Sequence, residues 1–177
     1  MDVSHELVEI IDEAGEVTSV ATRAQMRAER LRHRSAYILV RNGVGEILVH
    51  QRSPNKDLWP SRWDIACGGV ANVGESWQDA ATRELAEELA ITTAPAFLGL
   101  CTYVDADVSV LGAMFEVVWH GHIEFADQEV VDAVWLNISG LVEFLSTHSH
   151  CPDSVAMYAP YLELKLERPN AVVQSDS

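Results

Sequence analysis

Residues 69–91 have the sequence GVANVGESWQDAATRELAEELAI, the most informative stretch of this 177-residue chain. Ser76 followed by Asp79 is typical of a capping box, so we expect a helix to begin near Trp77. Apolar residues then recur every four positions, which predicts one buried stripe along this helix. The stripe consists of Trp77, Ala81, Leu85 and Leu89.

Three glutamates lie on another face of the same predicted helix: Glu84, Glu87 and Glu88. Like charges at this spacing repel by roughly 0.2–0.5 kcal/mol per pair, and Arg83 alone does not neutralise all three. A hard divalent cation such as Mg²⁺ compensates such a cluster, because it prefers oxygen ligands and commonly bridges carboxylates to substrate phosphates. Three glutamates taken alone are more often a solvated acidic face.

The spacing of the whole stretch resembles the Nudix box, which is Gly, five residues, Glu, seven residues, Arg-Glu-apolar, one residue, Glu-Glu, one residue, Gly, apolar. Ala90 stands where the family has Gly, and this change removes no ligand. On average residue usage, so many fixed positions coincide by chance on the order of once per million chains of this length. The matching positions are Gly69, Glu75, Arg83, Glu84, Leu85, Glu87, Glu88 and Ile91.

The resemblance implies an α+β fold in which a mixed β-sheet is sandwiched between α-helices. It also implies a Nudix-type pyrophosphohydrolase, in which Mg²⁺ or Mn²⁺ helps to drive water onto the diphosphate of a nucleoside diphosphate linked to another moiety X. A non-catalytic module that senses a nucleotide is an alternative use of the same fold. The box does not identify X, because specificity depends on loops and sheet residues outside it.

Residue roles carry over from the family only at matching positions. Glu75 and Arg83 are expected to fix the geometry of the loop and helix by pairing behind the metal ligands. One of the three helix glutamates is expected to double as the general base, so all three are candidate catalytic residues. The implied metal ligands are Gly69, through its backbone carbonyl, Glu84, Glu87 and Glu88.

Many relatives take a further carboxylate from a later loop, just before a strand that carries Trp. Glu129, six residues before Trp135, is the candidate catalytic carboxylate here, with Asp127 and Asp132 as alternatives. A solvated loop charge is the competing interpretation of Glu129.

The sequence predicts one domain with an N-terminal extension. Residues 1–32 are expected to form a β-hairpin with a Gly-containing turn, followed by a helix from Thr22 to about Leu31. Residues 33–170 are expected to form the Nudix domain, and 171–177 a flexible tail. Within the domain we expect strands at 36–40, 46–51, 63–66, 97–105, 113–123 and ending at 136, and helices at 138–147 and 154–166.

The segments at 32–40, 45–49 and 58–64 are similar to isopentenyl-diphosphate isomerases and their hydrolase-like relatives. The isomerase has a catalytic Cys directly before the box Gly, whereas this chain has Gly68 there and Cys67 one residue earlier. On a strand, that offset turns the side chain to the opposite face.

Other parts of the isomerase machinery are also missing. His33 matches one of its metal-binding histidines, but Met26 and Val70 stand at two others, and residues 111–114 lack its Glu-x-Glu. The sequence therefore predicts an isomerase-like Nudix hydrolase, with isopentenyl-diphosphate isomerisation by proton transfer as the alternative reaction.

Basic and aromatic residues are the candidates for substrate contact. Arg23, Arg27 and Arg30 fall on one helical face, which indicates either a solvated face or a basic lip for phosphate that Arg34 extends. Pocket aromatics in this family lie on sheet strands, so the aromatic substrate candidates are Tyr103 and Phe115, although such residues are more often core.

The amino-acid composition limits the classes of molecule that this protein is expected to bind. Asp and Glu number 27 against 12 Lys and Arg, a net charge of −15, which argues against a nucleic-acid polymer or an anionic membrane and leaves a small-molecule diphosphate. Three scattered cysteines and the lack of a signal peptide predict a reduced, cytoplasmic protein. The N-terminal hairpin is expected to have an exposed strand edge, which is compatible with a homodimer.

Overall fold

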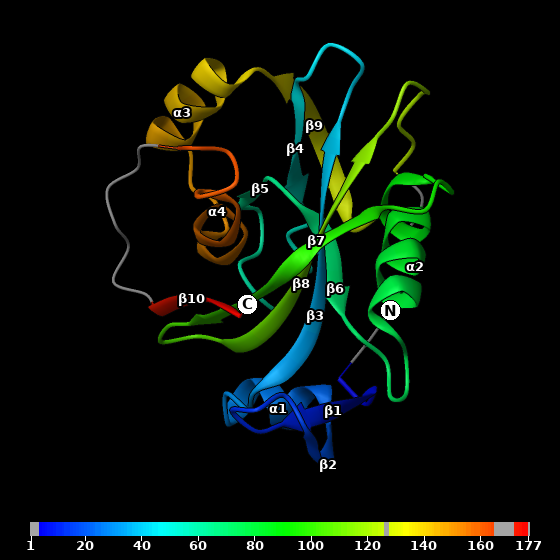
Figure 1. Ribbon diagram of the computed structural model, residues 1–177, viewed down its shortest axis with the longest axis vertical. Helices are drawn as coiled ribbons and strands as arrows, with labels where there is room; N and C mark the ends of the chain where they lie inside the picture. The colour runs from blue at the N-terminus through cyan, green and yellow to red at the C-terminus, as the bar shows by residue number, and fades with distance from the viewer. Residues whose placement is uncertain (1–3, 126–127, 165–171, 177) are drawn as a thin grey trace.

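A computed structural model describes residues 4–125, 128–164 and 172–176 of the chain (Figure 1). In these residues, ten strands form one mixed sheet, and four helices accompany it. The strands are β1 (Leu7–Ile11), β2 (Val17–Thr22), β3 (His33–Arg41), β4 (Ile47–Arg52), β5 (Trp63–Asp64), β6 (Cys67–Val70), β7 (Ala96–Val104), β8 (Ser109–Val118), β9 (Val130–Leu136) and β10 (Val172–Asp176). The helices are α1 (Arg23–Ala28), α2 (Trp77–Leu89), α3 (Ile138–Thr147) and α4 (Pro152–Tyr158).

Strand β3 is the centre of the sheet. It pairs in parallel with β8 along its whole length, from His33 opposite Val110 to Arg41 opposite Val118. It also pairs antiparallel with β1, β4 and β6, which places the N-terminal hairpin and the strand before α2 beside the same central strand. Most of the sheet follows the order β10-β7-β8-β3-β1-β2, while β4 continues to β5 and β9.

Helices cover both faces of the sheet, with α2 on one side and α3 and α4 on the other (Figure 1). Adjacent residues of β3 show this directly, because successive side chains of a strand point to opposite faces. Ile38 belongs to the apolar cluster that contains Leu85 of α2, whereas Leu39 belongs to the cluster that contains Leu141 of α3 and Tyr158 of α4. The predicted α+β fold, a mixed sheet between helices, is confirmed.

Helix α2 begins where its capping box predicts. The Ser76 hydroxyl accepts the Asp79 N–H at 3.1 Å and donates to the Asp79 carboxylate at 2.7 Å. Leu85 and Leu89 of the predicted stripe are fully buried. The helix ends at Leu89, and the next residue, Ala90, adopts the left-handed conformation with φ of 55°. This conformation favours Gly, which explains why the family pattern has Gly at this position.

The N-terminal extension packs on the sheet through a small core of its own. Met26 of α1 is 1% exposed and shares a cluster with Val70 of β6. Thr22 caps α1 by accepting the Gln25 N–H at 3.2 Å. The helix is shorter than predicted, because it ends at Ala28 and Arg30 takes a φ of 51° that helical residues do not adopt.

The structure differs from the sequence predictions at four other places. Strand β8 lies four residues earlier than predicted, and the segment 63–70 forms two short strands, of which β6 reaches the box. Helix α4 begins after Cys151 without a side-chain cap and ends at Tyr158, well before residue 166. Residues Val172–Asp176 form β10 beside β7, where a flexible tail was predicted. No helix in the described part combines the length and apolar character needed to cross a bilayer.

Candidate active site

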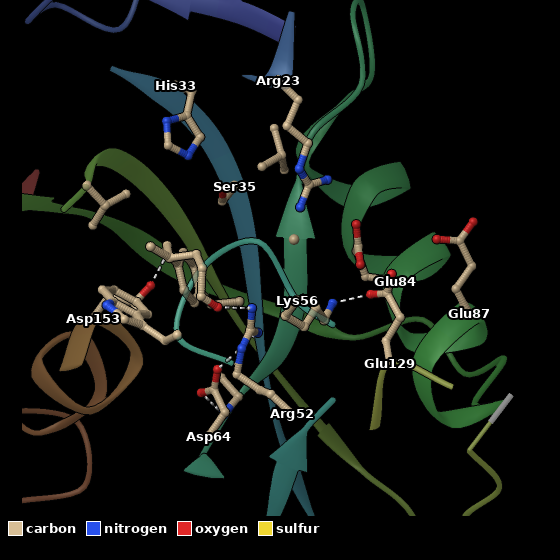
Figure 2. A pocket seen from close by; sticks show the side chains of 18 of the residues that line it. Arg23, His33, Ser35, Arg52, Lys56, Asp64, Glu84, Glu87, Glu129 and Asp153 are labelled. Carbon is tan, nitrogen blue, oxygen red and sulfur yellow. Dashed lines mark hydrogen bonds and ion pairs between the residues drawn. The ribbon is translucent and has the colours of Figure 1, made fainter. Parts of the chain in front are cut away.

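A cavity of about 230 Å³ lies between the end of β6, helix α2 and the N-terminal extension. Glu84 and Glu87 of α2 line it on one side. Figure 2 shows Lys56 and Glu129, from two different loops, close to those glutamates, and Arg23 from α1 at another side. The cavity therefore joins the helix glutamates to basic residues from distant parts of the chain.

Arg83 connects three of the glutamates. Its guanidinium donates to Glu84 at 2.7 Å, to Glu87 at 2.9 Å and to Glu75 at 2.9 and 3.0 Å. It also donates to the carbonyl of Val70 at 3.3 Å, which ties α2 to β6. Positive charge from Arg83 thus holds the box loop and the helix carboxylates together.

Lys56 connects the remaining two carboxylates. Its Nζ forms ion pairs with Glu88, at 3.1 Å, and with Glu129. The second oxygen of Glu88 accepts the Gly68 N–H at 3.1 Å, so this carboxylate, only 1% exposed, is held against β6. Glu129, in the loop that precedes β9, therefore lies close to the helix glutamates.

The cluster carries more negative than positive charge. Five carboxylates surround Arg83 and Lys56, which leaves a net charge of −3 when all are ionised. Burial, together with the nearby charge of Glu88, raises the pKa of Glu84 to about 7. Within the described residues, no three metal-binding side chains converge on one point, because the carboxylates turn toward Arg83 or Lys56.

The glycine that opens the box leaves room for one of these carboxylates. A Cβ at Gly69 would lie 2.7 Å from an oxygen of Glu84, closer than real contacts allow. The absence of a side chain at Gly69 therefore leaves the space that the Glu84 carboxylate occupies. Glu75 accepts the Asn72 N–H at 2.8 Å as well as the Arg83 bonds, which fixes the loop between Gly69 and α2.

Arg34, a predicted substrate residue, lies outside the lining of the cavity. It donates to Glu9 at 3.0 Å and to the carbonyl of Glu75 at 3.1 Å, and it lies over the Trp77 ring at 4.1 Å. Through these contacts, Arg34 joins β1, β3 and the start of α2.

The two predicted aromatic residues also lie elsewhere. Tyr103 and Phe115 are each 1% exposed, belong to the apolar clusters on opposite faces of the sheet and do not line the cavity. Both side chains are therefore part of the hydrophobic core. Of the alternatives to Glu129, Asp132 is exposed on β9 and does not line the cavity, while Asp127 lies outside the described residues.

Sequence reasoning missed a second acidic group at the cavity. Asp64 and Asp153 line it on the side away from α2, as Figure 2 shows. The Tyr37 hydroxyl donates to Asp153 at 2.7 Å, and the Ser154 N–H donates to its other oxygen at 2.7 Å. Burial and the charge of Asp64 raise the pKa of Asp153 to about 7. No local pattern marks this group, because Tyr37 and Asp153 are 116 residues apart.

Asp153→Asn is expected to reduce the pH dependence of stability. The folded protein keeps a proton on Asp153 that the unfolded chain loses above pH 3.8, so stability falls as pH rises from there to about 7. We expect the stability of the variant relative to wild type to rise by up to about 4 kcal/mol from pH 4 to pH 8, because the pKa of Asp153 rises from 3.8 to about 7 on folding and each tenfold difference in proton affinity corresponds to about 1.4 kcal/mol. Urea unfolding at pH 4 and pH 8 measures this, with exposed Asp132→Asn as the control. Identical pH dependence in all three proteins would contradict the prediction.

In the backbone conformation of this chain, the position before the box glycine has no room for a cysteine side chain. Gly68 has φ of 144°, and a Cβ there would lie 2.0 Å from the carbonyl oxygen of Ala36 on β3. Cys67 is 2% exposed and does not line the cavity, and burial raises the pKa of its thiol well above the usual value. The structure thus provides no reactive thiol where the isomerase has one.

A mixed sheet between helices, with a carboxylate-bearing helix at a cavity that also holds arginines, is typical of enzymes that act on phosphate compounds. A family model described as NUDIX domain matches residues 31–154. The chain is 42% identical over 134 residues, 75% of this chain and 73% of the relative, to the uncharacterized Nudix hydrolase YfcD of Salmonella typhi. It is 37% identical over 175 residues, 98% of this chain and 95% of the relative, to YfcD of Escherichia coli K12.

Solved structures agree with the fold. DR0079 from Deinococcus radiodurans superimposes with a TM-score of 0.70 at 23% identity, covering 89% of this chain and 98% of that one. The chain belongs to the Nudix family, and it is accordingly an enzyme of the pyrophosphohydrolase class.

Proposed function

We propose that this enzyme hydrolyses the diphosphate of a nucleoside diphosphate linked to another moiety X, with Mg²⁺ or Mn²⁺ held by Glu84, Glu87 and Glu88. The observation that carries the proposal is the cluster of five carboxylates around only two cations at the edge of the cavity. Such an excess of negative charge is suited to a divalent cation rather than to an anionic substrate alone.

The donor set fits a hard cation. All the candidate ligands are oxygens, three from carboxylates and one from the backbone carbonyl of Gly69, a residue whose added Cβ would lie 2.7 Å from Glu84. Oxygen-only sites suit Mg²⁺ and Mn²⁺ rather than softer transition metals. When bound, the ion supplies charge neutralisation of the diphosphate and activation of the attacking water.

The surrounding residues hold these ligands in place. Arg83 keeps Glu84 and Glu87 on one side of α2 and anchors Glu75 behind them. Lys56 lies between Glu88 and Glu129 and brings a positive charge to the cavity wall, where it can contact a phosphate oxygen. We assign proton acceptance from water to one of the helix glutamates or Glu129; of these, Glu84, Glu87 and Glu129 line the cavity.

A substrate panel tests the proposal. We expect turnover of at least one diphosphate class with Mg²⁺ or Mn²⁺ and none with EDTA. The panel contains nucleoside triphosphates, dinucleotide cofactors, nucleotide sugars, coenzyme A and prenyl diphosphates, and product masses identify which phosphorus is attacked. Tight binding without product for every member would contradict the proposal and favour a sensing module.

Deuterium exchange tests the alternative reaction, which is isomerisation of isopentenyl diphosphate. Isopentenyl diphosphate incubated with the protein in D₂O takes up deuterium if the protein is an isomerase. We expect no uptake, because Gly68 leaves no space for the catalytic cysteine and Cys67 is buried outside the cavity. Membership of the isomerase-like subgroup and a homodimer through the edge strand β2 both stay predictions.

A further inference from the structure

The N-terminal extension reaches the cavity with two arginines. Arg23 and Arg27 lie one turn apart on α1, and both line the cavity that Glu84 and Glu87 border. Their side chains are only 17% and 20% exposed, although α1 is a surface helix of six residues. Two charged side chains are thus directed inward rather than into solvent.

One carboxylate orients both arginines. The same oxygen of Asp57 accepts Nε of Arg23 at 2.9 Å and Nε of Arg27 at 3.1 Å. Burial alone would raise the pKa of Asp57, but the hydrogen bonds and charges of the two arginines outweigh burial and hold it far below its usual value. Asp57 follows Lys56 in the chain, so the loop that positions Lys56 at the glutamates also positions the arginines.

The two arginines differ in how many of their guanidinium nitrogens already form hydrogen bonds. Arg23 is bonded through all three nitrogens, because its Nη atoms also donate to Glu6 at 3.3 Å and to Asp57 at 3.5 Å. Arg27 is bonded through Nε alone among the described residues, so both of its Nη atoms keep their N–H groups for a ligand. A guanidinium fixed at Nε with its Nη edge open is suited to bidentate binding of a phosphate.

Neutral polar groups complete this end of the cavity. The Ser35 hydroxyl lines it and has no hydrogen-bond partner among the described residues. Burial, with the charge of Arg27, lowers the pKa of His33 to about 4, so the ring is neutral at pH 7. Figure 2 shows Arg23, His33 and Ser35 together at this end.

We propose that Arg27, oriented by Asp57 and backed by Arg23 and Ser35, binds a phosphate group of the substrate. The N-terminal extension is then part of the substrate-binding site rather than a structural addition. The inference rests on the proposed function and deepens it. The bound phosphate is either one of the two in the cleaved diphosphate or a further phosphate on the substrate, and the kinetic experiment separates these.

A binding experiment without turnover tests the site itself. Inorganic phosphate is titrated into the full chain in EDTA by calorimetry, and Arg27→Gln is expected to weaken binding by about 10-fold or more. Arg30→Gln is the matched control, because it removes the same charge near the same helix but Arg30 donates to the carbonyl of Asp105 and does not line the cavity. Equal weakening by both variants, or no binding by wild type, would overturn the proposal.

Kinetics then identify which phosphate is bound. Substrate pairs that differ by one phosphate, NADPH with NADH and coenzyme A with dephospho-coenzyme A, are compared in wild type and Arg27→Gln. An increase in KM of about 10-fold with kcat nearly unchanged for both members indicates the cleaved diphosphate, and an increase only for the phosphate-bearing member indicates the further phosphate. No change in KM for any hydrolysed substrate would overturn the proposal.

A further variant tests whether Asp57 orients Arg27. Asp57→Asn is expected to raise KM for the same substrates as Arg27→Gln, because it frees the guanidinium to move, while Arg27→Lys is expected to restore only part of the affinity. If the panel yields no hydrolysed substrate, the proposed function fails. Loss of inorganic phosphate binding in Arg27→Gln but not in Arg30→Gln would still support the phosphate site.

Discussion

Replacing both Glu87 and Glu88 with Gln is expected to lower kcat by about 1,000-fold or more while the chain stays folded. The double variant removes two carboxylates from a cluster of five and leaves oxygen atoms too weakly charged to hold a divalent cation. A loss of that size corresponds to about 4 kcal/mol of transition-state stabilisation, which is within the range of a metal's contribution. Turnover of the best panel substrate measures it.

The control removes the same charge elsewhere. Glu13→Gln combined with Glu143→Gln changes two exposed glutamates, one in the hairpin turn and one on α3. This variant is expected to retain wild-type kcat, and titration of Mn²⁺ is expected to show weakened binding only in the Glu87 and Glu88 variant. Full activity in a folded Glu87→Gln, Glu88→Gln protein would remove the basis of the metal assignment.

Gly68→Ala is expected to lower the free energy of unfolding by about 3 kcal/mol or more, because its Cβ would make the closest contact of any glycine substitution in the described residues. The new Cβ would lie 2.0 Å from the carbonyl oxygen and 2.9 Å from the carbonyl carbon of Ala36. Those atoms belong to β3, the central strand, which pairs with β8 and β6 and cannot move aside without breaking both ladders. Denaturant unfolding measures the loss.

A second glycine separates this clash from backbone strain. Gly45 has φ of 86° and nothing within 4 Å of a Cβ position, so Gly45→Ala carries the strain of a left-handed conformation without a contact. That substitution is expected to cost about 1–2 kcal/mol. If both substitutions cost the same, the contact with Ala36 does not determine the effect, and a clash no longer explains why cysteine is excluded from this position.

Local features of the sequence determined the family, the fold class and helix α2. The Ser76–Asp79 cap, the buried Leu85 and Leu89 and the hairpin were all readable, because caps, turns and helical stripes depend on residues within about four positions of one another. The spacing of the box also placed the glutamates on one side of α2. These predictions succeeded because the contacts that they describe are local.

Only the tertiary structure decided what lines the cavity. Lys56 meets Glu88 across 32 residues, and Arg27 meets Asp57 across 30, contacts that no local pattern encodes. Tertiary structure also decided where Tyr103 and Phe115 lie, because the pairing of β7 with β8 places both in the apolar core and not in the lining of the cavity. Strand order and register set which side chains reach the site, since the central strand β3 gathers segments that are far apart in the chain.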